Sequence, residues 1–218
     1  MVEGFNPVRY SIIKGKCPRE IVMLVGNGCK WRKCRFCDYH LDSSPDKEFN
    51  YKINKAELEK VIGMFGELEV INSGSFVDRD GNTIKMIKDI CVNKKIKKIH
   101  FECHWIHKDE VKEFKKEFMD LGVEPVIRLG LETFDYDFRE NYLVKGIDEK
   151  NPKIIAEYFD EINLLQGIEG QTAESMIWDI EMGLKHFKRV YVNIMTENKM
   201  PIKPDKMVIE QFRTKVYP

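Results

Sequence analysis

Gly26-Asn-Gly-Cys-Lys-Trp-Arg-Lys-Cys-Arg-Phe-Cys-Asp-Tyr-His40 is the stretch from which the rest of the chain is interpreted. It contains three of the six cysteines, Cys29, Cys34 and Cys37, and four basic side chains lie among them. Positive neighbours lower the pKa of a thiol and favour the thiolate, which is the form that binds metal. The stretch therefore predicts a site held by cysteine thiolates.

Three thiolates leave a four-coordinate site one ligand short, and two interpretations stay open. Iron–sulfur clusters usually take four cysteines, so a cluster on three would leave one iron open to another ligand. Alternatively, His40 could join the three cysteines in a structural zinc site of the Cys3His type. Three cysteines without a metal are less expected, because cysteines that gather in one loop usually have a metal or redox role.

The composition indicates a folded protein without a polyanionic partner. The chain has 218 residues, is 43% hydrophobic, and carries 36 basic and 36 acidic side chains for a net charge of zero. A domain that binds nucleic acid through its phosphates would usually be basic, so a nucleic-acid partner is disfavoured. We expect a cytoplasmic protein without a membrane partner, because the sequence has neither a long apolar run nor a signal-peptide pattern. Cys17, Cys91 and Cys103 are scattered and predict no disulfide framework.

Apolar runs alternate with helical patterns along the chain, which predicts a parallel α/β protein. Six strands are expected, at residues 20–25, 68–72, 98–104, 125–131, 161–166 and 189–194. An irregular lead-in precedes them and an extended arm follows them. Periodicity leaves open whether the sheet is doubly wound or a curved part-barrel, but both place function at the carboxyl ends of the strands. The cysteine stretch follows the first strand and lies at that edge.

Two of the predicted helices depend on capping residues and apolar spacing. Asn54 and Glu57 resemble a capping box, and the helix that they begin is expected to end at Gly66. Its apolar stripe is Leu58, Val61, Ile62 and Phe65. Thr172 is expected to cap a later helix. The inner face predicted for that helix is Met176, Ile177, Ile180 and Leu184.

Two segments resemble radical S-adenosylmethionine (SAM) enzymes. Cys34-Arg-Phe-Cys37 is similar to the second half of their Cys-x3-Cys-x-aromatic-Cys loop, although four residues rather than three separate Cys29 from Cys34. Asn163-Leu-Leu-Gln-Gly-Ile-Glu-Gly-Gln-Thr172 resembles the Asp-Leu-Ile-x-Gly-x-Pro-Gly-Gln-Thr run of the branch that includes oxygen-independent coproporphyrinogen oxidase. The resemblance implies an α/β fold, a single-domain partial (β/α)6 TIM barrel over residues 20–195. A lead-in at residues 1–19 and an extension at 196–218 that covers the barrel would flank it.

The resemblance also implies two cofactors, a 4Fe–4S cluster and SAM. Cys29, Cys34 and Cys37 would hold the cluster. Glu102 interrupts an apolar strand, which is costly unless the charge has a partner, and Arg139 offers a fork that suits a carboxylate. The residues expected at SAM are Phe36, Asn72, Ser73, Gly74, Ser75, Glu102, Glu132, Arg139, Gln166, Gly167 and Ile168.

In this superfamily an external one-electron reductant, such as flavodoxin or ferredoxin, drives reductive cleavage of SAM to a 5′-deoxyadenosyl radical. Residues 19–42 further resemble the small clostridial-type radical SAM proteins of the queuine lyase family. That resemblance implies cleavage of the C–N bond of queuine to release 7-aminomethyl-7-deazaguanine, a step of queuine salvage. Candidates for contacting this small deazaguanine base are Asp38, Tyr39, His40, His104, Trp105, Tyr191, Asn193 and Glu197.

Two other functions stay open at this point. The chain could be a radical SAM enzyme that acts on another small molecule, a nucleoside or a peptide. It could also be a non-enzymatic zinc-binding module built on the Cys3His set. The sequence does not indicate which side chain, if any, takes part directly in catalysis.

Overall fold

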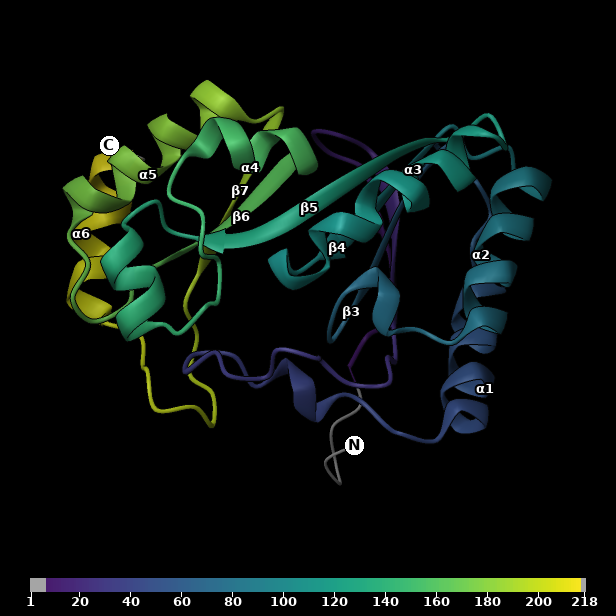
Figure 1. Cartoon of the computed structure of the whole chain (residues 1–218), viewed down its shortest axis with the longest axis horizontal. Coiled ribbons are helices and arrows are strands. Elements are labelled where there is room, and N and C mark those ends of the chain that lie inside the picture. The colour runs from purple at the N-terminus through teal and green to yellow at the C-terminus, as the bar shows by residue number, and fades with distance from the viewer. Residues whose placement is uncertain (1–6, 217–218) are drawn as a thin grey trace. The chain divides into compact units, whose positions relative to one another are not determined.

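The computed structural model describes residues 7–216, and Figure 1 labels the helices and strands. Residues 1–6 of the predicted lead-in and 217–218 of the predicted extension lie outside the described residues. The strands are β1 Tyr10–Ile13, β2 Arg19–Leu24, β3 Glu67–Asn72, β4 Lys98–Cys103, β5 Glu124–Glu132, β6 Glu161–Gln166 and β7 Arg189–Ile194. The helices are α1 Lys47–Leu58, α2 Gly81–Asn93, α3 Val111–Met119, α4 Pro152–Tyr158, α5 Ala173–His186 and α6 Lys206–Val216. The short turns are η1 Tyr39–Leu41, η2 Phe76–Asp78, η3 Trp105–Glu110 and the π-helical η4 Phe138–Tyr142.

The order of the strands in the sheet follows the order of the chain, from β1 to β7. β2 pairs in parallel with β3, and β3 with β4. β5 pairs in parallel with β6, and β6 with β7. All six predicted strands are present as β2 to β7, so the predicted α/β class is confirmed.

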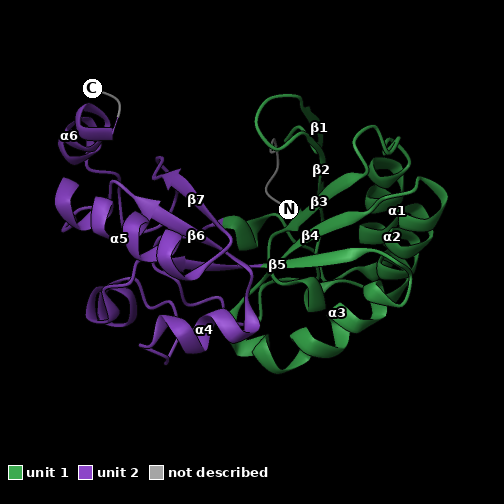
Figure 2. Cartoon of the chain, turned by 90° about the horizontal axis from the view of Figure 1, so that it is seen from above, with its two compact units in different colours: residues 1–30, 39–127 green, residues 31–38, 128–218 purple. Residues whose placement is uncertain are grey.

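The chain forms two compact units, which Figure 2 colours separately. Unit 1 consists of residues 1–30 and 39–127, and unit 2 of residues 31–38 and 128–218. The cysteine stretch is divided between them, since Cys29 belongs to unit 1 whereas Cys34 and Cys37 belong to unit 2. The domain boundaries expected after residues 19 and 195 stay predictions.

Strand β1 lies within the lead-in that the sequence predicts to be irregular, so that expectation is wrong for residues 10–13. β1 pairs antiparallel with β2, with Tyr10 opposite Val22. The Tyr10 hydroxyl also donates to Oε1 of the fully buried Glu20 at 2.7 Å. This strand is therefore fixed by its partner, whereas proline and glycine in the lead-in hide its pattern in the sequence.

The first helix of unit 1 begins earlier than the sequence predicts. α1 starts after Asp46, whose side chain accepts the backbone N–H groups of the first turn, and it ends at Leu58. Asn54 therefore lies inside the helix and does not cap it. Beyond α1 the Glu20 carboxylate accepts the backbone N–H groups of Ile62 and Met64 at 2.8 and 2.9 Å. This buried carboxylate holds a turn where the apolar spacing predicts more helix.

Helix α5 of unit 2 begins where the sequence predicts. Thr172 caps it, because its Oγ1 accepts the backbone N–H of Ser175 at 3.1 Å. Met176 is fully buried, as expected, but Leu184 is 64% exposed and does not belong to the inner face. Gly183 lies on the inner face instead. A Cβ there would lie 2.7 Å from a methyl group of Val190, so a larger residue would not fit.

The tail of the chain is helical rather than extended over residues 206–216, so the expectation of an extended arm is wrong there. In α6, Val208 and Phe212 are buried against Ala173 and Met176 of α5. The apolar spacing of residues 208, 209 and 212 carries the signal of this helix, but the prolines before it dominate the sequence pattern. α6 thus completes the helical layer of unit 2.

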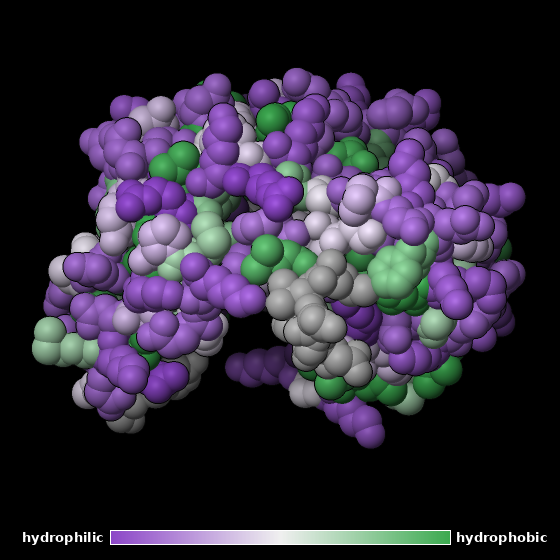
Figure 3. All heavy atoms as spheres, turned by 90° about the horizontal axis from the view of Figure 1, so that it is seen from below, coloured by the Kyte–Doolittle hydropathy of each residue, from purple (hydrophilic) through white to green (hydrophobic). Residues whose placement is uncertain are grey.

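The face of the molecule drawn in Figure 3 is mostly hydrophilic, with scattered hydrophobic side chains. This agrees with the 33% of residues that are charged. Among the described residues, none of the helices combines the length and apolar character needed to span a membrane.

Candidate functional site

In unit 1, two side-chain amides of α1 fix the end of β2, from which the cysteine stretch departs. The Val25 N–H donates to Asn54 Oδ1 at 2.7 Å, and Asn54 Nδ2 donates to the Val25 carbonyl at 2.9 Å. Asn50 Nδ2 donates to the Gly26 carbonyl at 3.3 Å. Asn54 thus serves as a buried anchor for the strand end, and the half-buried Cys29 follows shortly after it.

The structure brings three predicted site residues of unit 1 together at the ends of β3 and β4. Asn72 Nδ2 donates to the Ser75 carbonyl at 3.2 Å. The backbone N–H of His104 donates to Ser75 Oγ at 2.9 Å. Asn72 and Ser75 are buried, so the polar turn after β3 has a fixed conformation.

The other two residues of that turn, Ser73 and Gly74, contact Asp42 and Asp78. Ser73 Oγ donates to the backbone carbonyl of Asp42. The Asp42 carboxylate accepts a two-pronged pair of hydrogen bonds from Arg9, at 3.0 and 2.6 Å. At Gly74 a Cβ would lie 2.6 Å from Oδ2 of Asp78, so only glycine fits the turn without displacing that carboxylate.

Arg79 belongs to the same region, although the sequence analysis does not identify it. Its Nη2 donates to Asn72 Oδ1 at 2.5 Å and to the Val70 carbonyl at 3.2 Å, while Nε and Nη1 have no hydrogen-bond partner. Burial lowers the pKa of Arg79 to about 9, and the carboxylates of Glu102 and Asp78 partly offset this effect. The guanidinium therefore stays charged at neutral pH. A lone arginine in a loop gives no sequence signal of this role.

The remaining substrate candidates that follow β2 and β4 differ in exposure and in their contacts. Tyr39 is 73% exposed, and His40 is half-buried. Trp105 is buried, and the ammonium group of Lys108 lies 5.0 Å from its ring centroid, which indicates a packing role. The His104 ring accepts the backbone N–H two residues further on and thereby caps η3.

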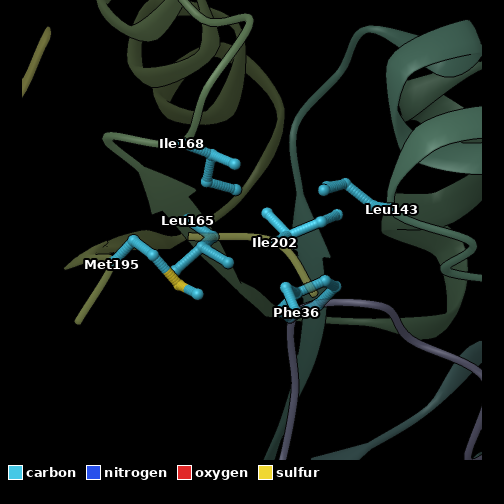
Figure 4. Close-up of a cluster of buried hydrophobic side chains, with 6 residues drawn as sticks. All are labelled: Phe36, Leu143, Leu165, Ile168, Met195 and Ile202. Atoms are coloured by element: carbon cyan, nitrogen blue, oxygen red, sulfur yellow. The ribbon is translucent and has the colours of Figure 1, made fainter. Parts of the chain in front are cut away.

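In unit 2, Phe36 lies in an apolar cluster that Figure 4 shows in close-up. Cys34 and Cys37 pack against this cluster, so both cysteines of unit 2 have apolar surroundings on one side. The structure thus brings Phe36 and Ile168, both expected at SAM, together beside the two cysteines. The buried members of the cluster are Phe36, Leu143, Leu165, Ile168, Met195 and Ile202.

Residues 143–146 hold the unit-2 part of the cysteine stretch, and we call them the clamp segment. The Arg35 N–H donates to the Leu143 carbonyl at 3.0 Å, and Trp31 Nε1 donates to the Val144 carbonyl at 2.9 Å. At Gly146, where φ is +72°, a Cβ would lie 2.2 Å from an atom of the Trp31 ring. The indole therefore lies directly on the glycine backbone, which leaves no room for a side chain.

The C-terminal region contacts the same part of the cysteine stretch. Asn198 Nδ2 donates to the Phe36 carbonyl at 2.6 Å. The Lys199 N–H donates to the Asp38 carboxylate at 3.3 Å. Residues 31–38 are therefore held from two sides within unit 2.

A β-bulge at the end of β5 directs Glu132 toward a buried lysine. The pairing with β6 shifts between Gly130 and Glu132, and Glu132 has a φ of +72°. Lys145 Nζ lies 2.8 Å from Glu132 Oε1. A Cβ at Gly130 would lie 2.7 Å from that oxygen and 2.9 Å from the lysine nitrogen, so the glycine makes room for the ion pair. Bulges commonly re-aim a side chain in this way.

Lys145 is the main site residue that the sequence analysis misses. It is buried, and its ammonium group lies 5.5 Å from the centroid of the Phe36 ring. Burial by itself would lower the pKa of Lys145, but the negative charges of Glu132, Cys34 and Cys37 outweigh this and raise it above its ordinary value. Lys145 therefore stays positively charged, and it lies close enough to Cys34 and Cys37 for their charges to affect its pKa.

The end of β6 contains a buried amide without a partner. Both polar atoms of the Gln166 side chain lack a hydrogen bond, and the residue is fully buried. Gly167 has a φ of +85°, and a Cβ there would lie 2.2 Å from Ile209 of α6. The Ile168 N–H donates to Gln171 Oε1 at 2.9 Å. Gly167 and Ile168 thus have structural partners, whereas Gln166 has none.

Arg139 is committed to contacts within unit 2. Its Nε donates to the Glu140 carboxylate at 2.9 Å, and its Nη1 donates to the Thr133 carbonyl at 3.2 Å. Its Nη2 donates to the carbonyls of Ile147 and Glu149 at 3.1 and 2.7 Å. With all three nitrogens engaged and the side chain buried, Arg139 does not fit the carboxylate-binding role that the sequence analysis assigns to it.

The three substrate candidates near the end of β7 differ in their contacts and exposure. The Arg128 guanidinium lies 3.6 Å from the centroid of the Tyr191 ring, and Arg189 Nη1 donates to the Tyr191 hydroxyl at 2.9 Å. Two arginines therefore hold Tyr191. Asn193 and Glu197 are exposed.

Burial divides the cysteines into three groups, of which the first is the exposed Cys17 alone. Cys29, Cys34 and Cys37 are half-buried and take part in no disulfide. Cys91 and Cys103 are buried, and burial raises the pKa of Cys91 to about 12 and raises that of Cys103 as well. Buried neutral thiols are poor ligands, so these two are excluded as cluster cysteines. Inside the described part of each unit, no three His, Cys, Asp or Glu side chains gather around one metal-ion position.

Neither a scan against protein-family models nor a search of curated proteins found a match for this chain. Among solved structures, the chain is similar to queuine lyase from Clostridium spiroforme bound to SAM and queuine, with 40% sequence identity and a TM-score of 0.92. The similarity covers 96% of this chain and 90% of that chain. This chain belongs to the queuine lyase family of radical SAM enzymes.

Membership of the queuine lyase family confirms the predicted fold class, the radical SAM partial TIM barrel. It also confirms that the chain is an enzyme. The alternative of a non-enzymatic zinc-binding module is therefore excluded.

Proposed function

We propose that this enzyme is itself a queuine lyase, which cleaves the C–N bond of queuine and releases 7-aminomethyl-7-deazaguanine for queuine salvage. One observation carries the proposal, the 40% identity over 96% of the chain to a queuine lyase whose structure holds SAM and queuine. A relationship of that extent includes every strand end at which a site of this fold is built.

The cluster ligands would be Cys29, Cys34 and Cys37. They are half-buried and take part in no disulfide, whereas Cys91 and Cys103 are buried and have raised pKa values. A positive charge close to a thiol favours the thiolate that binds iron, and the buried Lys145 supplies such a charge to Cys34 and Cys37. When bound, a 4Fe–4S cluster and SAM would supply the one-electron chemistry that makes a 5′-deoxyadenosyl radical.

Each unit contains residues that we propose for SAM binding. In unit 1 these are Asn72–Ser75 and Glu102, to which we add Arg79 because two of its nitrogens lack partners. In unit 2 they are Phe36, Glu132 and Gln166–Ile168, of which Gln166 has the clearest need of a ligand. A buried amide without a hydrogen bond is costly unless a ligand or water satisfies it. Arg139 is left out because its nitrogens are engaged.

The substrate contacts stay proposals. A deazaguanine needs donors and acceptors at its edge and a flat face to stack on. Among the candidates, Trp105 and Tyr191 are engaged in packing or with arginines. Asp38, Tyr39, His40, His104, Asn193 and Glu197 are half-buried or exposed and stay candidates.

We also propose an external one-electron reductant, such as flavodoxin or ferredoxin. The exposed side chains of Arg32, Lys33 and Arg35 lie beside the cysteines of unit 2 in sequence. Small electron carriers of this kind are acidic, and complementary charge speeds association and fixes orientation.

An anaerobic assay tests this proposal. Protein reconstituted with iron and sulfide receives SAM and a chemical reductant, with and without queuine, and 5′-deoxyadenosine is quantified. We expect formation to rise sharply with queuine and to be absent in Cys34→Ala. Slow formation that is indifferent to queuine would contradict the lyase and point to another small molecule, nucleoside or peptide. Failure of the wild-type protein to bind iron or cleave SAM would contradict the cofactor assignment.

A further inference from the structure

We propose that Lys145 and Glu132 together set the reduction potential of the cluster, with Lys145 raising it and Glu132 lowering it. The inference rests on the proposed function, because it requires a cluster on the cysteines. It concerns a buried ion pair of unit 2 that would act on the cluster through the cysteine sulfurs. Lys145 would therefore influence the cluster by its charge and would not be a catalytic residue.

The geometry fixes the lysine beside the cysteines. Its neighbours in the clamp segment, Leu143 and Val144, accept hydrogen bonds from Arg35 and Trp31 of the cysteine stretch at 3.0 and 2.9 Å. The ammonium group is then held 2.8 Å from Glu132 Oε1 and 5.5 Å from the centre of the Phe36 ring. The clamp segment that holds the cysteine stretch therefore also places the Lys145 ammonium group beside it.

The surroundings of this pair make its charges effective. Lys145 and Glu132 are each at most 11% exposed at the side chain, and Cys34 and Cys37 pack against the apolar cluster around Phe36. Charges interact more strongly in a poorly hydrated interior than in water, and salt screens them less there. A charge on Lys145 should therefore act on the cysteines far more than a charge at the protein surface.

The redox consequence follows from charge balance. Reduction adds one electron, supplied by the external one-electron reductant, and no proton or bond change is required at Lys145. The electron increases the negative charge on the cluster and its thiolates, and the ammonium group stabilises this more negative form. The Glu132 carboxylate has the opposite effect, and it limits how far Lys145 raises the potential.

The fold makes special provision for this pair. Glu132 lies where the pairing of β5 with β6 shifts, and it adopts a left-handed backbone conformation that a non-glycine residue rarely adopts. Gly130 leaves the space that the two charged groups occupy. Strained backbone conformations of this kind tend to persist at functional sites.

The test is a redox titration of the reconstituted protein without SAM, followed by electron paramagnetic resonance. We expect the midpoint potential to move to more negative values in Lys145→Met and to more positive values in Glu132→Gln. Lys145→Arg should keep the wild-type potential because it keeps the charge. Lys150→Met, which removes an exposed lysine five positions further on, should leave the potential unchanged.

Each outcome decides between the proposals. Equal potentials in the wild type, Lys145→Met and Glu132→Gln would overturn the inference and leave the proposed function standing. If Lys145→Met fails to fold, Glu132→Gln still decides, because the absence of a positive shift would overturn the inference. A wild-type protein that takes up no cluster would instead overturn the proposed function.

Discussion

Burial separates the three clustered cysteines, which we propose as cluster ligands, from the two cysteines of the core. Cys29, Cys34 and Cys37 lie half-buried in one stretch, whereas Cys91 and Cys103 are enclosed in the core of unit 1. The spacing in the sequence predicts the first three as ligands, and this stays a prediction. For two of the other three, Cys91 and Cys103, the structure adds a reason why they are unsuitable, since burial raises their pKa and favours the neutral thiol, whereas Cys17 is exposed and set apart only by its position in the sequence.

Replacing one cysteine from each group should separate them sharply. Cys34→Ala should lose bound iron and all SAM cleavage, because two thiolates are left to hold the cluster. Cys91→Ala should keep both, at a modest cost in stability for the small cavity. Iron and sulfide analysis after reconstitution checks this. Equal loss of iron in the two variants would mean that the cluster ligands are misassigned.

Glu102 provides a second test at this scale, because its charge faces the buried Arg79. Glu102→Gln should weaken SAM binding by about ten- to a hundredfold, the range expected for losing a charged hydrogen bond. Iron content should not change. Binding of SAM to the reconstituted protein can be followed by calorimetry, with the exposed Glu124→Gln as the control. An unchanged affinity in Glu102→Gln would remove Glu102 from the site.

Single residues also mark the limit of sequence reasoning. The sequence predicts the cysteines, Phe36 and the glycine-rich run after β6 as site residues, because each has a recognisable local pattern. It misses Arg79 and Lys145, because a lone basic residue in a loop looks the same whether it is solvated or buried. It does not reveal the contacts of Arg139, whose acceptors are mostly backbone carbonyls that leave no side-chain pattern.

At the scale of elements, the clamp segment is the part of unit 2 most closely tied to the cysteine stretch. Gly146→Ala should destabilise the protein and reduce iron retention, because its Cβ would collide with Trp31. Gly122→Ala is the matched control, since Gly122 has a similar φ of +74° but open space around it. The control should lose about 1–2 kcal/mol from backbone strain alone.

Denaturant unfolding and iron analysis of the two glycine variants distinguish these effects. The predicted result is a larger loss of stability in Gly146→Ala than in Gly122→Ala, with iron lost only in the former. If Gly146→Ala keeps its iron and loses no more stability than the control, the indole contact does not support the site.

Helix α5 carries a buried carboxyl that makes stability depend on pH. Asp179 Oδ1 accepts the Phe134 N–H at 2.7 Å and the Thr133 hydroxyl at 3.1 Å. Burial, the largest effect, raises the pKa of Asp179 to about 6. The folded protein therefore binds this proton more tightly than the unfolded chain, whose Asp pKa is about 3.9. The group favours folding most below pH 4, and this contribution is lost as the pH rises through 6.

Asp179→Asn tests that sign, because asparagine keeps an acceptor oxygen but carries no charge. Wild-type stability should fall relative to the variant by on the order of 1–3 kcal/mol as the pH rises from 4.5 to 7.5. Urea unfolding at several pH values measures the difference. A constant difference across this range would show that Asp179 titrates normally.

Element prediction succeeds where burial alone decides and fails where a distant side chain intervenes. β2 to β7 are found because buried parallel strands give continuous apolar runs. Helix α1 is misplaced because the turn after it depends on Glu20, which lies far away in sequence. The bulge in β5 leaves no local signal in the sequence. It accompanies an ion pair between Glu132 and Lys145, which lies thirteen residues away.

For the whole molecule, the rule that function gathers at the carboxyl ends of parallel strands accounts for the site residues in each unit. Unit 1 contributes the turns after β2, β3 and β4, and unit 2 those after β5 and β6. The alternation of strands and helices is sufficient to predict this arrangement of the site along the chain. No such rule predicts the substrate. The proposal of queuine rests on the similarity to a solved queuine lyase.

Product analysis by mass spectrometry tests the central claim most directly. The reconstituted enzyme is incubated anaerobically with queuine, SAM and a one-electron reductant, with Cys34→Ala as the control. We predict that 7-aminomethyl-7-deazaguanine accumulates as queuine disappears, and that neither change occurs in the control. Intact queuine in the presence of a SAM-cleaving wild-type enzyme would contradict the assignment as a queuine lyase.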